Sequence, residues 1–149
     1  MQTIITKSFC ELSLDELYEV LKLRVDVFVV EQNCPYPELD SVDRETETQH
    51  VMIWENSKLS AYARCYRKKD NTFAIGRVVV DVEARGRGLA QKIMDEALSV
   101  CKNQEGVTCC FLSAQVYLKG FYASYGFMEV GEEYLEDGIP HQDMSLTVS

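Results

Sequence analysis

Near Ser13 the pattern of apolar positions changes from strand-like alternation to helical spacing. Residues 3–9 alternate polar and apolar side chains, which predicts a short strand. Ser13 followed by Glu16 forms a capping box, in which each side chain satisfies a free amide at a helix start. The apolar residues that follow recur at helical spacing and predict a helix with one core-facing stripe, made of Leu14, Leu17, Leu21, Val25 and Phe28.

The rest of the chain shows strand patterns, a surface loop and two further helices. Residues 33–49 hold two prolines and several acidic residues with no sustained period, which is typical of a loop. The later apolar runs predict strands at 50–54, 59–66, 73–82, 107–113, 128–133 and 142–148, the first three as an antiparallel meander. A long amphipathic helix follows Gly86 and is closed by Gly106, and a short helix covers 116–125. The pattern predicts one α+β domain over residues 1–149, with helices flanking a mixed, mostly antiparallel sheet.

Composition and charge exclude several classes of protein. The chain has 149 residues and a formal net charge of -9, which disfavours a nucleic-acid partner and suits a cationic amine. No apolar run approaches the roughly 20 residues that span a bilayer, and the N-terminus has no secretion signal, so we expect a cytoplasmic protein without a membrane partner. The six cysteines lack metal-ligand spacing, so we expect reduced thiols and no metal site.

The segment with the clearest chemistry is the turn from an apolar strand into the long helix. The strand leads through Arg85, Gly86, Arg87 and Gly88 into the helix. The first amides of a helix have no intrahelical partner, and glycine lets the backbone approach a phosphate closely, so this turn predicts an anion site. The two glycines could instead serve only a tight bend. The pattern lacks the Lys-Ser/Thr of a P-loop and the full GxGxxG of a dinucleotide fold, so a different diphosphate is needed.

Here the sequence resembles the GNAT superfamily of N-acetyltransferases. The cofactor motif of that family is Arg or Gln, two residues, Gly, one residue, then Gly or Ala, and Arg85, Gly88 and Ala90 fill it. The resemblance implies that the loop amides bind the CoA pyrophosphate and that the preceding strand binds the pantetheine arm. The residues it assigns to the cofactor are Val78, Val80, Arg85, Gly86, Arg87, Gly88, Leu89, Ala90, Gln91 and Gln115, the last standing where many relatives have Asn.

Residues 121–127, with the sequence FYASYGF, look like a second signature of the family. By that resemblance Tyr122 is the general acid that protonates the leaving thiolate. Further segments, among them 27–36 and 136–141, are similar to the ElaA-like branch. The resemblance implies a GNAT fold, acetyl-CoA as co-substrate without a metal, and acetyl transfer to a primary amine of a small molecule or protein by direct attack in a ternary complex.

A base must take a proton from the amine, because an ammonium has no lone pair for attack on the thioester. The candidates are His50, His141, Glu31, Asp81 and Glu136. We carry His141 forward as the base, although it could equally anchor a turn by hydrogen bonding.

Three arginines, Arg24, Arg64 and Arg77, lie within apolar segments, where an unpaired guanidinium is costly. We expect Glu31 and the acidic loop to pair with them. A loop as long as 33–49 is also a candidate for lining a substrate opening, with Tyr36, Glu38, Asp40 and Asp43 as candidate residues.

Two other functions stay open. One is an acyl-CoA-sensing module that performs no turnover. The other is a synthase similar to the acyl-homoserine-lactone synthases, suggested by Arg24-x-x-Val27-Phe28 with acids downstream. Relatives often dimerise, which leaves a homodimer open as well.

Overall fold

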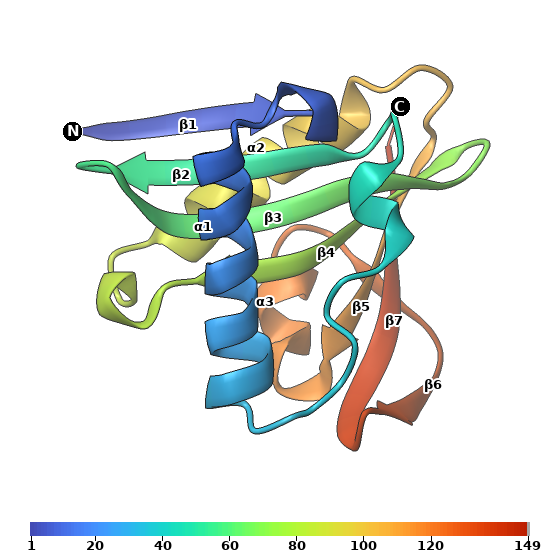
Figure 1. The fold of residues 1–149 in the computed structure, drawn as a ribbon. Helices are drawn as coiled ribbons and strands as arrows, with labels where there is room; N and C mark the ends of the chain where they lie inside the picture. The colour runs from blue at the N-terminus through green and yellow to red at the C-terminus, as the bar shows by residue number, and fades with distance from the viewer. Residues whose placement is uncertain (149) are drawn as a thin grey trace.

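The computed structural model, which describes residues 1–148, contains one seven-stranded sheet with helices on its faces (Figure 1). The strand order is β1-β2-β3-β4-β5-β7-β6, and neighbours are antiparallel except β4 and β5, which are parallel. The strands are β1 Gln2–Lys7, β2 Gln49–Glu55, β3 Lys58–Lys69, β4 Thr72–Val80, β5 Cys109–Gln115, β6 Met128–Glu136 and β7 Ile139–Thr147. This confirms the α+β class and the mixed, mostly antiparallel sheet that the sequence predicts.

Helix α1 spans Leu14–Arg24 and continues as a π-helical segment, Val25–Glu31. The predicted capping box at its start is confirmed, because Ser13 Oγ accepts from the Glu16 amide at 3.0 Å and Glu16 accepts from the Ser13 amide at 2.8 Å. Helix α2 spans Leu89–Lys102. The predicted helix at 116–125 is shorter, since a 3-10 turn at Val116–Leu118 precedes α3, Lys119–Ala123. Short 3-10 turns also occur at Phe9–Glu11, Ser41–Arg44 and Val82–Ala84.

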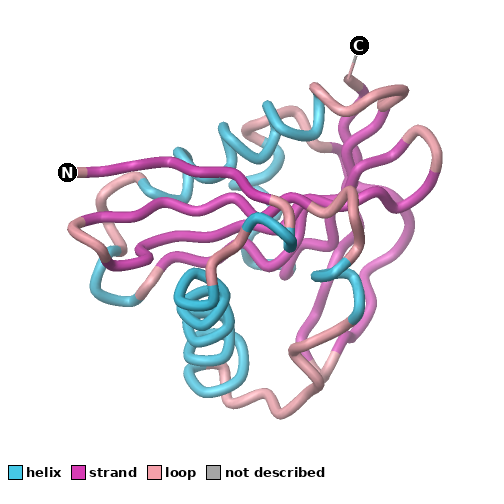
Figure 2. Tube along the Cα trace, turned by 45° about the horizontal axis from the view of Figure 1, so that its top comes forward, coloured by secondary structure: helices cyan, strands magenta, loops and turns pink. Residues whose placement is uncertain are grey.

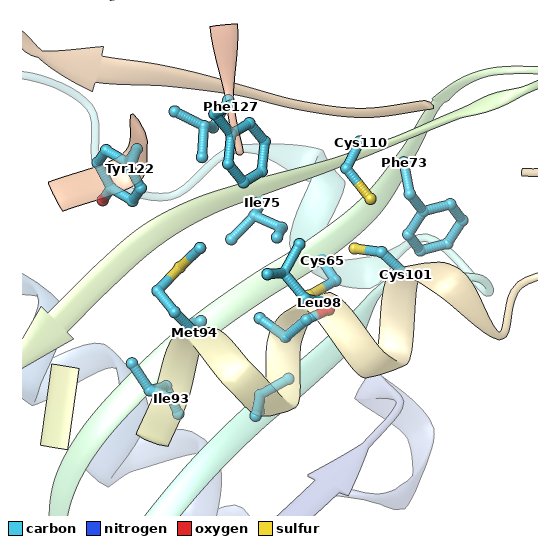
Figure 3. Packing of buried hydrophobic residues seen from close by; sticks show 14 of the residues in the cluster. Cys65, Phe73, Ile75, Ile93, Met94, Leu98, Cys101, Cys110, Tyr122 and Phe127 are labelled. Carbon is cyan, nitrogen blue, oxygen red and sulfur yellow. The ribbon is translucent and has the colours of Figure 1, made fainter. Parts of the chain in front are cut away.

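Helices α1 and α2 cover opposite faces of the sheet (Figure 2). The core residues are divided between these two faces because successive side chains along a strand point to opposite faces of the sheet. On β2, Met52 packs with α1, while its neighbours Val51 and Ile53 pack with α2. The larger core lies on the α2 side, where α2 packs against β3, β4 and β5 (Figure 3).

The predicted core stripe of α1 is wrong at Leu14, whereas Phe28, at its other end, does pack against the core. Leu14 is 86% exposed, and the buried face is instead made of Val20, Leu23, Arg24 and Val27. Arg24 is a charged residue that a hydrophobic pattern assigns to solvent. Its side chain is instead fully buried on this face, where it pairs with the loop carboxylates of Glu38 and Asp43.

Strands β4 and β5 are paired only where they begin. Their parallel register runs from Thr72↔Cys109 to Ala74↔Phe111 and then stops, although both strands continue. The sheet is therefore open between the second halves of β4 and β5, and the backbone edges that face the opening have no ladder partner there.

Candidate active site

A cleft of about 880 Å³ occupies the opening between β4 and β5. Its walls are the ends of both strands, the start of α2, the π-helical segment and the turn between β6 and β7. The residues that the resemblance assigns to the cofactor line this cleft except Arg87, and so do Tyr122 and His141. Of the loop candidates for the substrate opening, Tyr36 lines it, whereas Glu38, Asp40 and Asp43 do not. Residues 2–7 of β1 take no part in it.

The glycine loop lies at one end of the cleft. Gly86 and Gly88 both hold φ of +80°, a left-handed conformation that L side chains rarely adopt. Gly88 is the residue before α2, and no side chain caps the first amides of that helix. These amides lie at the positive end of the helix dipole, so the arrangement suits a bound anion.

Arg85 and Arg87 point in different directions. Arg85 lines the cleft, and its guanidinium binds both carboxylate oxygens of Glu31 at 2.7 and 2.8 Å. Arg87 lies outside the cleft and binds both oxygens of Glu55 at 2.6 and 3.0 Å. Hydrogen bonds from Arg87, Ser60 and Gln2 lower the pKa of Glu55 to about 2. Of the two arginines, only Arg85 is placed to meet a ligand in the cleft.

A β-bulge interrupts the pairing of β3 and β4 beside the cleft. Arg77 and Val78 stand together opposite Ala63, and Arg77 holds a φ of +53°. Beyond the bulge, the edge of β4 facing β5 has no strand partner, so the backbone of Val78 and Val80 is open to the cleft. The Val80 carbonyl accepts a hydrogen bond from Arg85 Nε at 3.1 Å.

Tyr122 reaches the cleft from α3 and is only 7% exposed. Its ring packs edge-on against Phe121, with ring centroids 5.2 Å apart. It also packs edge-on against Phe127, with ring centroids 6.4 Å apart (Figure 3). The hydroxyl has no hydrogen-bond partner within residues 1–148. Burial raises the pKa of Tyr122 to about 12, so the phenol stays protonated at neutral pH and can donate.

Gln115 and His141 stand opposite each other on β5 and β7 and line the cleft together. The Gln115 amide donates to Gln32 at 3.3 Å, which links β5 to the residue after the π-helical segment. His141 is 8% exposed, and its Nδ1 lies 2.7 Å from the Ile139 carbonyl. A carbonyl only accepts, so in the neutral imidazole Nδ1 carries the proton and Nε2 keeps the lone pair that a base requires.

The other candidate bases are placed less well. His50 is buried between the Tyr62 hydroxyl and the Asp43 carbonyl, outside the cleft. Asp81 pairs with Lys58 and also lies outside the cleft. Glu31 is held by Arg85. Glu136 lines the cleft, and its Oε2 lies 3.5 Å from His141 Nε2, where it would stabilise a protonated imidazole.

A buried ion-pair network forms the wall of the cleft behind β3 and β4. Arg24 binds Glu38 at 2.6 Å and Asp43 at 2.7 Å, Arg64 binds Asp40 and Asp43, and Arg77 binds Glu38 at 2.9 Å. This confirms that the acidic loop pairs with the three arginines, whereas Glu31 pairs with Arg85. Burial disfavours the charged guanidinium of Arg24 and would lower its pKa. The carboxylates of Asp43 and Glu38 favour the charge more strongly, so the pKa of Arg24 lies above its usual value.

The structure adds cleft residues that the sequence did not single out. They come from strands and turns far apart in the chain and include Tyr66, Phe111, Ser113, Asp137 and Ile139. The sequence signal that could have found Phe111 and Ser113 is alternation along β5, because their neighbours Cys110 and Leu112 are buried in the core.

Within residues 1–148, no group of three or more His, Cys, Asp or Glu side chains could hold a metal ion. None of the described helices is long and apolar enough to cross a membrane.

Comparisons with known proteins identify the family. The family model for the acetyltransferase (GNAT) domain matches residues 22–148. Protein ElaA of Escherichia coli is 43% identical over 140 residues, covering 93% of this chain and 92% of that protein. Its crystal structure superposes with a TM-score of 0.92, covering 97% of this chain and 99% of that chain.

A crystal structure described as an acyl-CoA N-acyltransferase from Pseudomonas aeruginosa also superposes with a TM-score of 0.92. It is 42% identical and covers 97% of this chain and 99% of that chain. A CoA-dependent acyl-homoserine lactone synthase superposes at 0.83 with 18% identity, covering all of this chain and 84% of that one, which shows a common fold alone. The chain belongs to the GNAT acetyltransferase family, in its ElaA-like branch.

Proposed function

We propose that the protein transfers an acetyl group from acetyl-CoA to a primary amine, as one domain over residues 1–149. The observation that carries the proposal is the placement of Tyr122 and the glycine loop in one cleft beside an open strand edge. The loop amides and Arg85 would hold the pyrophosphate, and the backbone of Val78 and Val80 would pair with the pantetheine arm.

The reaction needs one proton to leave the amine and one to reach the sulfur. His141 Nε2 takes the first proton, the amine nitrogen forms a bond to the thioester carbon, and the carbon–sulfur bond breaks. Glu136 lies 3.5 Å from Nε2 and stabilises the imidazolium that results. The proton then passes from His141 to the thiolate, so that CoA leaves as a thiol.

Tyr122 contributes by donating a hydrogen bond to the sulfur while negative charge develops on it. Its pKa of about 12 lies above the reference thiol value of about 8.5, so complete transfer of the phenol proton is unfavourable. A donor directed at charge that exists only in the transition state lowers the barrier without tightening substrate binding.

The decisive experiment measures free-thiol release from acetyl-CoA with a panel of primary amines. Amine-dependent release, with the acetylated amine identified by mass spectrometry, would support the proposal. Binding of acetyl-CoA without release for any amine would favour the sensing module instead. Release that depends on S-adenosylmethionine would favour the synthase, whose support is a shared fold at 18% identity.

A further inference from the structure

The β5–β7–β6 half of the sheet has a face that α2 and α3 do not cover. Leu112 and Met144 point from β5 and β7 into the core under α2. Alternation along the strands therefore places Ser113, His141 and Asp143 on the opposite face. The register sets Ser113 beside Asp143. The face continues from the cleft, because Ser113 and His141 line it.

Asp143 is a carboxylate on this face that is held by hydrogen bonds to one of its two oxygens. Its Oδ1 accepts from Ser113 Oγ at 2.8 Å and from Tyr134 Oη at 2.6 Å, and both donors are neutral. Its Oδ2 accepts no hydrogen bond from residues 1–148. The Tyr134 ring also stacks on His141, with centroids 6.0 Å apart. The carboxylate is thus held in place beside the proposed base without a cation to balance it.

His141 supplies an independent indication that a ligand nitrogen binds here. Its Nδ1 proton is donated to the Ile139 carbonyl, so in the neutral imidazole the lone pair is at Nε2. The group facing Nε2 is Glu136 Oε2 at 3.5 Å, and a carboxylate has no proton to donate. In its neutral form, a side chain that is 8% exposed and lines the cleft therefore presents an acceptor to which no group of residues 1–148 donates. An N–H group entering the cleft would satisfy it.

The charges around the cleft favour a ligand with more than one positive charge. Each guanidinium that lines the cleft is paired: Arg85 with Glu31, Arg77 with Glu38, and Arg64 with Asp40. The ammonium of Lys68 lies 4.5 Å from the Phe111 ring centroid and is the basic group at the far end of this face. Glu136 pairs with His141 only when the imidazole is protonated, and Asp143 has neutral donors alone within the described residues.

We propose that the acceptor is a linear diamine or polyamine, whose second ammonium binds Asp143 Oδ2. This rests on the proposed acetyltransferase function. The reacting nitrogen gives its proton to His141 Nε2 and bonds to the acetyl carbon as described above. His141 and Asp143 are successive residues on one strand face, about 7 Å apart, a separation that a short methylene chain can span.

The test compares diaminobutane with butylamine, which has the same carbon chain and one charge fewer. Calorimetric titration of each amine, with CoA present, measures binding without requiring turnover. The kcat/KM of each is then measured by thiol release. We expect diaminobutane to bind about tenfold more tightly, as for a hydrogen bond between charged groups.

Asp143→Asn keeps the shape and removes the charge, and it should bring the ratio of the two affinities to about one. Tyr134→Phe keeps the ring on His141 and removes one donor to Asp143, so it should lower the ratio partway. Asp95→Asn, at an exposed position of α2, is the matched control and should keep the parental ratio.

Equal affinities for the two amines in the parent would overturn the proposal. So would a preference for diaminobutane that survives in Asp143→Asn, or selective binding of a lysine-rich peptide over diaminobutane. Failure of the acetyltransferase function gives a different result, since thiol release would then be absent with both amines while the titrations still measure the amine site.

Discussion

Replacing Gly88 by valine tests the pyrophosphate loop directly. A Cβ at this position would have the Gln91 side-chain oxygen at 3.8 Å as its nearest neighbour, so packing within the protein accepts a side chain. The backbone does not, because φ is +80° and a left-handed conformation costs an L residue about 1–2 kcal/mol. We expect the free energy of unfolding to fall by about 2 kcal/mol, the upper end of this range, because valine is β-branched. A domain whose free energy of unfolding has the usual value of roughly 5–15 kcal/mol remains folded after this loss.

The assay is the shift in Tm that acetyl-CoA produces. At about 100 times its Kd, a ligand that binds only the native state stabilises it by about 2.7 kcal/mol. For a domain of this length, each kcal/mol moves Tm by about 2–4 °C, so the parental Tm should rise by about 5–11 °C. Valine at position 88 places methyl groups where the diphosphate must approach the loop amides, so the shift should nearly disappear.

Gly106→Val is the matched control. Gly106 follows α2 with a φ of +77°, and a Cβ there would lie 4.0 Å from the Asp70 carbonyl, so its backbone strain is similar. It lies outside the cleft. This variant should lose stability like Gly88→Val and keep the full response to acetyl-CoA. If folded Gly88→Val responds as strongly as Gly106→Val, the assignment of the loop to the pyrophosphate is refuted.

Three other predictions follow from the site and its surroundings. Tyr122→Phe should lower kcat by roughly 10²-fold or more with little change in acetyl-CoA affinity, whereas Tyr125→Phe, outside the cleft, should retain kcat; equal turnover of both variants would make Tyr122 a packing residue. Glu31→Gln should tighten acetyl-CoA binding in a titration, since it frees Arg85; weaker binding would contradict this. Although burial opposes it, hydrogen bonds from Arg24 lower the pKa of Asp43 in the folded protein. The ionised Asp43 therefore contributes to the free energy of unfolding above its unfolded pKa of about 3.9, and this contribution is lost as pH falls through the folded pKa. Urea unfolding should show this loss below about pH 4 in the parent, and a smaller loss in Asp43→Asn.

The end of the cleft that we propose for the cofactor could be predicted from sequence because its parts are contiguous. The open strand edge, the glycines and the start of α2 follow one another along the chain, so a local pattern carries them. The end that we propose for the acceptor could not be predicted in this way. Tyr66, Phe111 and Asp137 come from β3, β5 and the turn after β6, and only the strand register brings them to one cleft.

The buried face of α1 was missed for a related reason. A hydrophobic pattern assigns Arg24 to solvent, and its burial depends on carboxylates of Glu38 and Asp43 in a loop with no periodic pattern. The sequence did predict that buried arginines would be paired, since the cost of an unpaired charge is general. Which carboxylate pairs with which arginine depends on the path of the loop, and Glu31 pairs with Arg85 rather than with the buried group.

Arginine–carboxylate pairs have two different roles in this cleft, and burial separates them. The Arg24 and Glu38 side chains are 0% and 3% exposed, so breaking that pair leaves an uncompensated charge and costs about 3–5 kcal/mol. A substrate cannot displace such a pair, and the wall it supports is rigid. The Arg85 and Glu31 side chains are 40% and 42% exposed, and an exposed pair contributes little to stability. A diphosphate can therefore exchange with Glu31 for Arg85. Arginine–carboxylate pairing thus holds a rigid buried wall behind β3 and β4, and it leaves Arg85 as an exchangeable cation beside the loop that we propose for the pyrophosphate.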